Sequence, residues 1–503
     1  MYKKELPRVA PESVGLSSAR VLQLLKDLED ATEMHGFMLA RHGQVVAESW
    51  WAPYTADFPH ICHSLGKSYV ATGVALAIAD GLMTVEDRIV DLFAQEIEAL
   101  GVEVTENLRA LRVKHLLTMS NGMARHPALD ENLVRNYLTE PIAYKPGTRF
   151  MYNTAGTSML GEIVTRLTGR SLHEYMGEKL FEKIGIERDK LLWLPYKNGL
   201  DASPGIATTT ENNLRLGLLY QNGGSWDGEA LLPPDYVRAA TTPQMDNSGF
   251  GTTKDEQSGY GYQIWMCAVP GAYRFDGGHG QLTYVSPAHD VVFSINQSGM
   301  MPSGTTRVQE LITAFLSEPM SGESLPANEA EYQALRSWAA SRRLPEGTVT
   351  RLPDKPGRLD GLYRVCSGAF HIYPELRAND RDNLDRAFYS IDDEYCKTLS
   401  IRTLSDQEIE ITLDHFAKLL VRLDGRLEPI KTNCAIRTYD VSCSTGYYDG
   451  PDTLVVHMRW LHTCLSSTLR LTRYPNELLI DVAKNTLHET STEIRYIARA
   501  KPL

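Results

Sequence analysis

Strand-like segments lie at both ends of the first 320 residues, and helical segments occupy the stretch between them. Residues 36–51 form two short apolar runs around Arg41-His42-Gly43-Gln44, which predicts a β-hairpin. Strand-like runs return over residues 260–297, and residues 305–316 have the apolar period of a closing helix. This order predicts one sheet built from both ends of a domain, with a helical lobe inserted between them. We therefore expect an α+β domain.

Helices are predicted where apolar residues recur every three to four positions. The two clearest cover residues 19–33 and 64–78, and two later helices stop at Gly169 and Gly185. The second is strongly apolar, so we expect it to be buried.

The character of the sequence changes after Ser317. We expect a domain of residues 1–320, a helix and proline-rich linker over 321–356, and an all-β domain of residues 357–503. The strand-like runs of the all-β domain cover 361–365, 397–404, 408–413, 418–423, 453–461, 467–474, 476–483 and 493–499. Short runs separated by turns predict an antiparallel barrel or sandwich. A packing or oligomerisation module is the first interpretation of this domain, and a cap over the active-site cleft is the second.

Composition excludes several classes of partner. The net charge of −12 argues against nucleic acid and anionic membranes. We find neither an export signal nor the run of about 20 apolar residues that spans a bilayer, so we expect a cytoplasmic protein. Seven scattered cysteines without a CxxC pair indicate free thiols. A homo-oligomer is left open.

Several common sites are absent from the sequence. It contains no HExxH, no Walker A loop and no G-x-S-x-G motif. His60, Cys62 and His63 lie close together, but no second cluster completes a metal-ligand set. We therefore expect neither a metal nor a cofactor.

The stretch HSLGKSYV places Ser64 three residues before Lys67. If the stretch is helical, the two side chains share one face. A serine hydroxyl becomes a good nucleophile only when a neighbouring group accepts its proton, and a lysine buried by the apolar flanks could take that part. The alternative is a chance serine and lysine one helical turn apart.

Two further segments could complete a site. Tyr152 lies in a turn just before a helix and could present its phenolic oxygen, although a half-buried loop aromatic is the plain alternative. In FDGGHGQLTYVSP a strand passes through Gly277 and Gly278, whose exposed backbone N–H groups could form an oxyanion hole. A tight β-turn would also explain glycines there.

Together these segments resemble the serine β-lactamase and penicillin-binding-protein-like hydrolases, in particular the esterases and peptidases related to class C β-lactamases (peptidase S12-like). The resemblance covers about residues 11–316 and is carried by HSLGKSYVATGVALAIADGLMTVEDRI, VKHLLTMSNGM, KPGTRFMYNTAGTSMLGEIV, YGYQIWM and GGHGQLTYVSP. It implies a β-lactamase-like fold, an antiparallel sheet flanked by helices with a helical lobe.

The resemblance also implies roles for individual residues. Ser64 would attack an acyl carbonyl, Lys67 would help move its proton, and Tyr152 would act as a general base and acid. The backbone N–H of Ser64 and one near Gly278 or His279 would form the oxyanion hole.

The sequence departs from the family pattern in two places. The asparagine expected two residues after the tyrosine, which would contact a substrate amide, is Thr154, with Asn153 one place early. Thr154 and Asn153 are therefore the candidates for substrate binding there. No Lys-Thr-Gly occurs in the chain, and the matching segment is Phe275-Asp276-Gly277-Gly278-His279. His279 could replace that lysine or could be a structural turn histidine.

Because the missing lysine would hold a substrate carboxylate, we expect a serine hydrolase of small esters or amides, of the carboxylesterase or D-amino-acid amidase and peptidase type. The alternatives are an acyltransferase using the same acyl-enzyme, a β-lactamase or D-Ala-D-Ala carboxypeptidase, and a non-catalytic binding scaffold.

Overall fold

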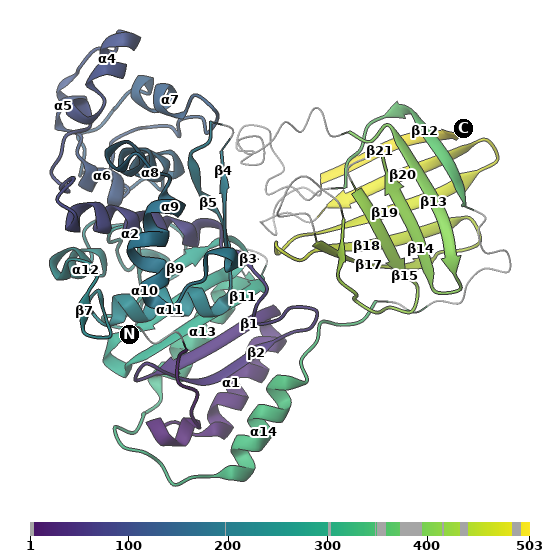
Figure 1. The fold of residues 1–503 in the computed structure, drawn as a ribbon, viewed down its shortest axis with the longest axis horizontal. Helices are drawn as coiled ribbons and strands as arrows, with labels where there is room; N and C mark the ends of the chain where they lie inside the picture. The colour runs from purple at the N-terminus through teal and green to yellow at the C-terminus, as the bar shows by residue number, and fades with distance from the viewer. Residues whose placement is uncertain are drawn as a thin grey trace. The chain divides into compact units, whose positions relative to one another are not determined.

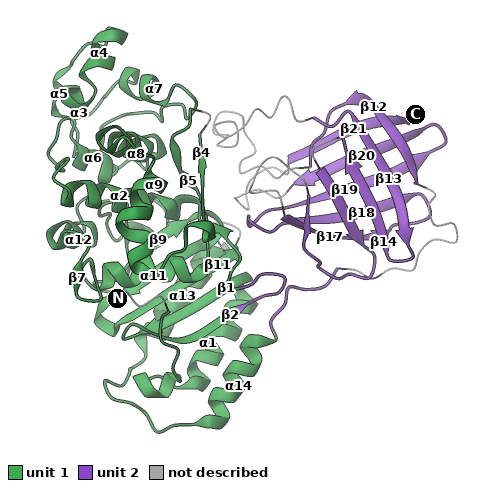
Figure 2. Cartoon of the chain, in the orientation of Figure 1, with its two compact units in different colours: residues 1–49, 56–299, 303–341 green, residues 50–55, 300–302, 342–503 purple. Residues whose placement is uncertain are grey.

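The computed structural model describes residues 5–196, 198–299, 303–347, 349, 359–372, 395–414, 417–432, 441–484 and 494–503 (Figure 1). The chain forms two compact units (Figure 2). Unit 1 holds Met1–Ser49, Ala56–Gly299 and Ser303–Ser341, and most of unit 2 is Arg342–Leu503. The domain limits drawn from the sequence, at residues 320 and 357, stay predictions.

Unit 1 is built around a sheet with the strand order β2-β1-β11-β10-β9-β8. β1 pairs antiparallel with β11, from Glu33 opposite Ser298 to Arg41 opposite Val291, as the purple and teal strands of Figure 1 show. Early and late segments of the unit therefore meet inside one sheet, and the predicted hairpin and sheet are confirmed. The strands are β1 (Glu33–Arg41), β2 (Gln44–Trp50), β8 (Trp265–Met266), β9 (Tyr273–Gly277), β10 (Gln281–Ser286) and β11 (Val291–Ser298).

Helices cover both faces of this sheet. Neighbouring residues of a strand point to opposite sides, so β11, which carries apolar side chains on both sides, needs a helix on each face. Phe293 of β11 packs against Phe315 of α13 (Ser303–Ser317), with ring centroids 5.8 Å apart. The preceding residue, Val292, faces α11 (Thr210–Gln221), where a Cβ added at Gly217 would come within 2.8 Å of it. β11 is consequently buried along nearly its whole length. On the α13 side, α13 also packs against α1 (Ser18–Ala31), which in turn packs against α14 (Glu329–Ala340).

The helical lobe follows β3 in the sequence and precedes β8. Its central helix is α2 (Gly66–Ala79), which packs against α8 (Thr154–Thr168) and is buried from Gly66 to Ala77. A small antiparallel sheet that the sequence did not predict joins β3 (His60–Ile61), β5 (Asp201–Thr208) and β4 (Leu191–Pro195). The lobe also contains α3 (Ile89–Leu92), α4 (Ala94–Leu100), α5 (Glu106–Ala110), α6 (Val113–Leu117), α7 (Leu133–Thr139), α9 (Leu172–Met176), α10 (Glu182–Ile184) and α12 (Pro234–Ala240).

Two predicted elements are shorter than expected. The helix predicted over residues 64–78 begins at Gly66, and Ser64 lies in the preceding 3-10 turn η2 (His63–Leu65). The strand predicted from residue 260 is reduced to β8, because Gly259 and Gln263 have positive φ angles of 110° and 58° that interrupt extended backbone.

Unit 2 contains a sheet that closes into a barrel. The strand order is β15-β14-β13-β12-β21-β20-β19-β18-β17-β16, and β15 also pairs with β17 through Val421–Ser444 and Arg422–Thr445. Of the two predicted forms of this domain, the barrel is therefore right. Its strands are β12 (Gly361–Gly368), β13 (Thr398–Ser405), β14 (Glu408–Leu413), β15 (Ala417–Arg422), β16 (Ile430–Lys431), β17 (Val441–Tyr448), β18 (Thr453–Trp460), β19 (Ser466–Tyr474), β20 (Glu477–Lys484) and β21 (Ile494–Pro502).

The barrel interior is a packed apolar core. Burial alternates strictly along β14 and β20, so Ile409, Ile411, Ile480 and Val482 point inward with Trp460 of β18. Among the helices that the structure describes in either unit, none has the length and apolar character that a bilayer-spanning segment requires.

Candidate active site

Ser64 lies where the small sheet meets the first turn of α2. β3 pairs with β5, and the Cys62 N–H donates to the Ile206 carbonyl oxygen at 2.7 Å. Two residues after the serine, Gly66 lets β5 approach closely, because a Cβ there would lie 2.0 Å from the Ser203 carbonyl oxygen. Both the paired strand and the glycine fix the turn that holds Ser64.

Lys67 donates a hydrogen bond to Ser64. Its Nζ lies 2.9 Å from Ser64 Oγ, and the lysine side chain is buried, with 2% of the residue exposed. A lysine is almost never buried to this degree without a specific partner. The hydroxyl and the amine are therefore already within proton-transfer distance.

Tyr152 is the third residue of this group. Lys67 Nζ lies 4.9 Å from the centroid of the Tyr152 ring. The buried His63 ring feels the same amine: burial, and then the positive charge of Lys67, lower the pKa of His63 to about 4. The structure thus brings Ser64, Lys67 and Tyr152 together, as the sequence predicts. Their catalytic roles are taken up below as a proposal.

Aromatic packing holds Tyr152 in place. Its ring stacks on Trp265, with centroids 5.5 Å apart and planes 27° apart, and it also meets Phe250 at 6.2 Å. Trp265 belongs to β8 and Phe250 to the loop before it. Neither contact with Tyr152 can be recognised from the sequence, because only the folded chain brings these aromatic residues to Tyr152.

The two residues after Tyr152 have different positions. Asn153 is fully buried and is the N-cap of α8, where its Oδ1 accepts a hydrogen bond from the Gly156 N–H at 3.0 Å. The side chain of Asn153 is thus committed to the helix cap. Thr154 is the first residue of α8 and is partly exposed. Their predicted role in substrate binding stays a prediction.

Gly277 ends β9 directly against the turn that holds Ser64. A Cβ at Gly277 would lie 2.0 Å from the Cys62 carbonyl oxygen and 3.1 Å from the Leu65 nitrogen. Gly278 follows in the turn η6 (Gly278–Gly280). This close approach of two backbones is what an oxyanion hole formed by both segments would need.

His279 lies inside the protein and not at its surface. None of the residue is exposed, its φ is 59°, and its ring centroid lies 5.9 Å from that of His63. Its carbonyl oxygen accepts a hydrogen bond from the Gly299 N–H at 3.0 Å. Both roles considered for His279 stay predictions.

Gln263 is a buried residue that the sequence analysis missed. Its Nε2 donates to the carbonyl oxygens of Leu116 and Leu117 at 2.9 and 3.1 Å, and its Oε1 accepts from Thr157 Oγ1 at 2.7 Å. Its own carbonyl oxygen accepts from Ser68, the residue after Lys67. Gln263 thereby connects α2, α6 and α8 behind the site.

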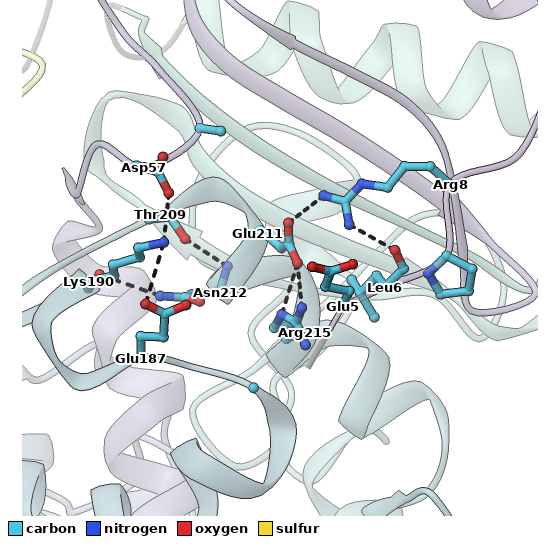
Figure 3. A pocket seen from close by; sticks show the side chains of 13 residues that line it. Glu5, Leu6, Arg8, Asp57, Glu187, Lys190, Thr209, Glu211, Asn212 and Arg215 are labelled. Atoms are coloured by element: carbon cyan, nitrogen blue, oxygen red, sulfur yellow. Dashed lines mark hydrogen bonds and ion pairs between the residues drawn. The ribbon is translucent and has the colours of Figure 1, made fainter. Parts of the chain in front are cut away.

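A polar pocket of about 770 Å³ lies elsewhere in unit 1 (Figure 3). Most of its charged groups are already paired, for example Arg8 with Glu211 at 2.6 Å and Lys190 with Asp57 at 2.7 Å. Ser64, Lys67 and Tyr152 are not among the residues that line it. The pocket is therefore distinct from the group around Ser64.

The residues once considered for a metal have other partners. His60 Nε2 lies 2.8 Å from His35 Nδ1. Burial raises the pKa of the Cys62 thiol to about 12, so this thiol stays protonated at neutral pH. Across the described residues no group of three or more potential ligand side chains could hold a metal ion. The expectation that the protein needs no metal or cofactor stays a prediction.

Comparisons with known proteins place this geometry in a family. The chain is 23% identical over 291 residues to the 6-aminohexanoate-dimer hydrolase of Paenarthrobacter ureafaciens, covering 53% of this chain and 74% of that one. It is 34% identical over 94 residues to the lovastatin esterase of Penicillium rubens, covering 16% of this chain and 23% of that one. A structure of an octameric penicillin-binding protein homologue from Pyrococcus abyssi has a TM-score of 0.47 and 13% identity, over 95% of this chain and 99% of that one.

The model of the Beta-lactamase family matches residues 23–312, which is more than half of the chain. This match includes the serine, the lysine, the tyrosine and every strand of the central sheet. The expected β-lactamase-like fold of the first unit is thus confirmed, and the chain belongs to the Beta-lactamase family.

Proposed function

We propose that this protein is a serine hydrolase that works through an acyl-enzyme on Ser64. The observation that carries the proposal is the hydrogen bond of 2.9 Å between the buried Lys67 amine and Ser64 Oγ. In its neutral form this amine can accept the hydroxyl proton as the oxygen attacks.

The reaction has two halves. Ser64 Oγ attacks the acyl carbonyl carbon and gives its proton to Lys67, and the bond to the leaving group then breaks while that group takes up a proton. Tyr152, next to Lys67, delivers this proton and takes up in turn the one that Lys67 received. In the second half water attacks the acyl carbonyl carbon and gives a proton, through the same two groups, to Ser64 Oγ as the bond between Oγ and the acyl group breaks. This step releases the acid and regenerates Ser64.

Backbone N–H groups stabilise the negative charge that develops on the carbonyl oxygen. The N–H of Ser64 and one of the segment Gly278–His279 are the donors we propose. The contact of Gly277 with the turn of Ser64 supports this choice because it brings both segments together.

Small esters or amides are the proposed substrates. Relatives of the chain include proteins named as an esterase, as a dimer hydrolase and as an amidase, which supports a hydrolase of such bonds. The one guanidinium on β9, that of Arg274, is engaged by Asp276 at 2.7 Å. It is therefore poorly placed to hold the carboxylate of a β-lactam or of a D-Ala-D-Ala peptide. We further propose that the protein acts in the cytoplasm.

Labelling with a fluorophosphonate probe tests the proposal. The intact mass of the wild type is expected to rise by one adduct, and Ser64→Ala is expected to show none. Lys67→Met should label far more slowly, whereas Lys179→Met, which removes an exposed lysine paired with Asp80, should label like the wild type. A folded wild-type protein without an adduct would overturn the hydrolase and favour a binding scaffold.

A further inference from the structure

An aromatic cluster beside the nucleophile has one exposed face. We call Phe150, Tyr152, Phe250, Tyr260 and Trp265 the aromatic wall. Phe250 meets Phe150 at 5.5 Å and Trp265 at 5.3 Å, and Tyr260 meets Trp265 edge-on at 4.9 Å. These spacings are those of favourable aromatic pairs, so the wall is a packed surface.

Exposure differs across the aromatic wall. Tyr260 and Trp265 form its base, with 1% and 8% of each residue exposed, while Phe250 is 37% exposed. Phe150 and Tyr152 are half-buried. A large apolar ring exposed on an aromatic surface gains free energy when a ligand covers it.

The wall is continuous with the catalytic group. Tyr152 belongs to both, and its ring centroid lies 4.9 Å from Lys67 Nζ, which lies 2.9 Å from Ser64 Oγ. A substituent attached to a carbonyl under attack by Ser64 can therefore reach the wall.

The guanidinium of β9 next to the wall is already paired, which leaves it poorly placed to hold an anion. Arg274 lies 5.5 Å from the Trp265 ring, but it is bonded to Asp276 and to the carbonyl oxygens of Asp255 and Met266. The Asp276 side chain is 27% exposed. An anionic substituent would meet the Asp276 carboxylate.

We propose that the aromatic wall binds the leaving group of the substrate, and that this group is a neutral, flat aromatic ring system. The inference rests on the hydrolase function proposed above. The leaving group is assigned to the wall because Tyr152 is both part of the wall and the proposed donor of the leaving-group proton. Donor and acceptor of a proton must lie within hydrogen-bond distance.

A series of acetates with similar leaving-group chemistry tests the assignment. The substrates are ethyl, cyclohexylmethyl, benzyl, 2-naphthylmethyl and 4-carboxybenzyl acetate. We expect kcat/KM to rise from ethyl through benzyl to 2-naphthylmethyl, with cyclohexylmethyl below benzyl. The kcat/KM of the 4-carboxybenzyl ester should be about tenfold lower than that of the benzyl ester. Repulsion between its carboxylate and Asp276 at close range should weaken binding by about this factor.

Phe250→Ala removes the exposed ring of the wall. The ratio of kcat/KM for 2-naphthylmethyl over ethyl acetate should fall by about tenfold, the upper range for one aromatic contact. Phe250→Leu should give an intermediate ratio and guards against a folding defect. Tyr474→Ala, an exposed aromatic residue of unit 2, is the matched control and should keep the wild-type ratio.

Two results would overturn the assignment, and fluorophosphonate labelling separates them. If Ser64 is labelled but the ratio is the same in Phe250→Ala and wild type, the wall does not bind the leaving group and the hydrolase stands. If Ser64 is not labelled, both proposals fail. As a second readout, 2-naphthylmethanol should inhibit the wild type competitively and should inhibit Phe250→Ala more weakly.

Discussion

The buried imidazole of His63 is expected to make unit 1 sensitive to acid. Its pKa is lowered to about 4, mainly by burial and secondly by the charge of Lys67. In the unfolded chain a histidine has a pKa of about 6.5. Between pH 6.5 and about pH 4, His63 therefore binds a proton in the unfolded state and stays neutral in the folded state.

The sign and size of the effect follow from this difference. Above pH 6.5 His63 is neutral in both states and does not change the free energy of unfolding. As the pH falls from 6.5 toward 4, that free energy decreases by about 1.4 kcal/mol per pH unit. At pH 5 the loss from His63 alone is about 2 kcal/mol, a large part of the 5–15 kcal/mol that is typical of a domain.

The variant His63→Asn removes the titrating group and suits the local backbone. His63 has a φ of 49°, and asparagine tolerates this left-handed region better than most residues. His42→Asn is the matched control, because His42 has a φ of 52° and an exposed side chain. It reports what the substitution does at a left-handed position, together with the loss of the contact between His42 Nδ1 and Asp290 Oδ2 at 2.6 Å.

Urea unfolding at pH 7.5 and 5.0 measures the effect. Circular dichroism at 222 nm selects unit 1, because the helices that the structure describes all lie in that unit. Acidification should lower the free energy of unfolding by about 2 kcal/mol less in His63→Asn than in the wild type. If both proteins lose the same amount, the pKa of His63 is not lowered and the reasoning is refuted.

Two further substitutions follow from close contacts. Gly277→Ala places a methyl group 2.0 Å from the Cys62 carbonyl oxygen, so fluorophosphonate labelling should slow by about a hundredfold, while Gly322→Ala, in open space, should label normally. Normal labelling of the first variant would show that Gly277 does not shape the site. Asn153→Ala removes the cap of α8 and should lower the free energy of unfolding by about 1 kcal/mol, with a smaller loss for Asn153→Ser; equal losses would argue against the cap.

Much of the fold could be predicted from local sequence signals. The first helix, expected over residues 19–33, is α1, and its start is set by Ser17, which accepts a hydrogen bond from the Arg20 N–H. The hairpin of β1 and β2 follows from apolar runs around a His-Gly turn. Such signals depend on neighbouring residues alone, so they can be recognised without the tertiary structure.

Elements that depend on distant partners were missed. β3 has only two residues, and its pairing with β5 brings together parts of the chain far apart in sequence. β17 has the sequence VSCSTGYY, whose buried Ser442, Cys443 and Ser444 give no apolar alternation. A strand of this kind is defined by its neighbours in the barrel more than by its own composition.

The candidate site shows the same division. Ser64, Lys67 and Tyr152 could be predicted because their spacing and flanks are characteristic. Phe250 and Gln263 could not, since each acts through residues brought close by folding. Asn153 illustrates a third case: its substrate contact stays a prediction, and the helix cap that its side chain forms is seen only in the fold.

The pairing of β1 with β11 has a consequence for how the protein is made. β1 leaves the ribosome early, yet its partner strand Val291–Ser298 emerges only after the whole helical lobe has been synthesised. Until then the nascent chain carries an apolar strand with an unpaired edge, the kind of surface that promotes misassembly and recruits chaperones. Gly277 also emerges late. Its backbone can therefore pack against the turn that holds Ser64 only when most of unit 1 has been synthesised. An incomplete chain would therefore hold Ser64 and Lys67 without Gly277 beside them.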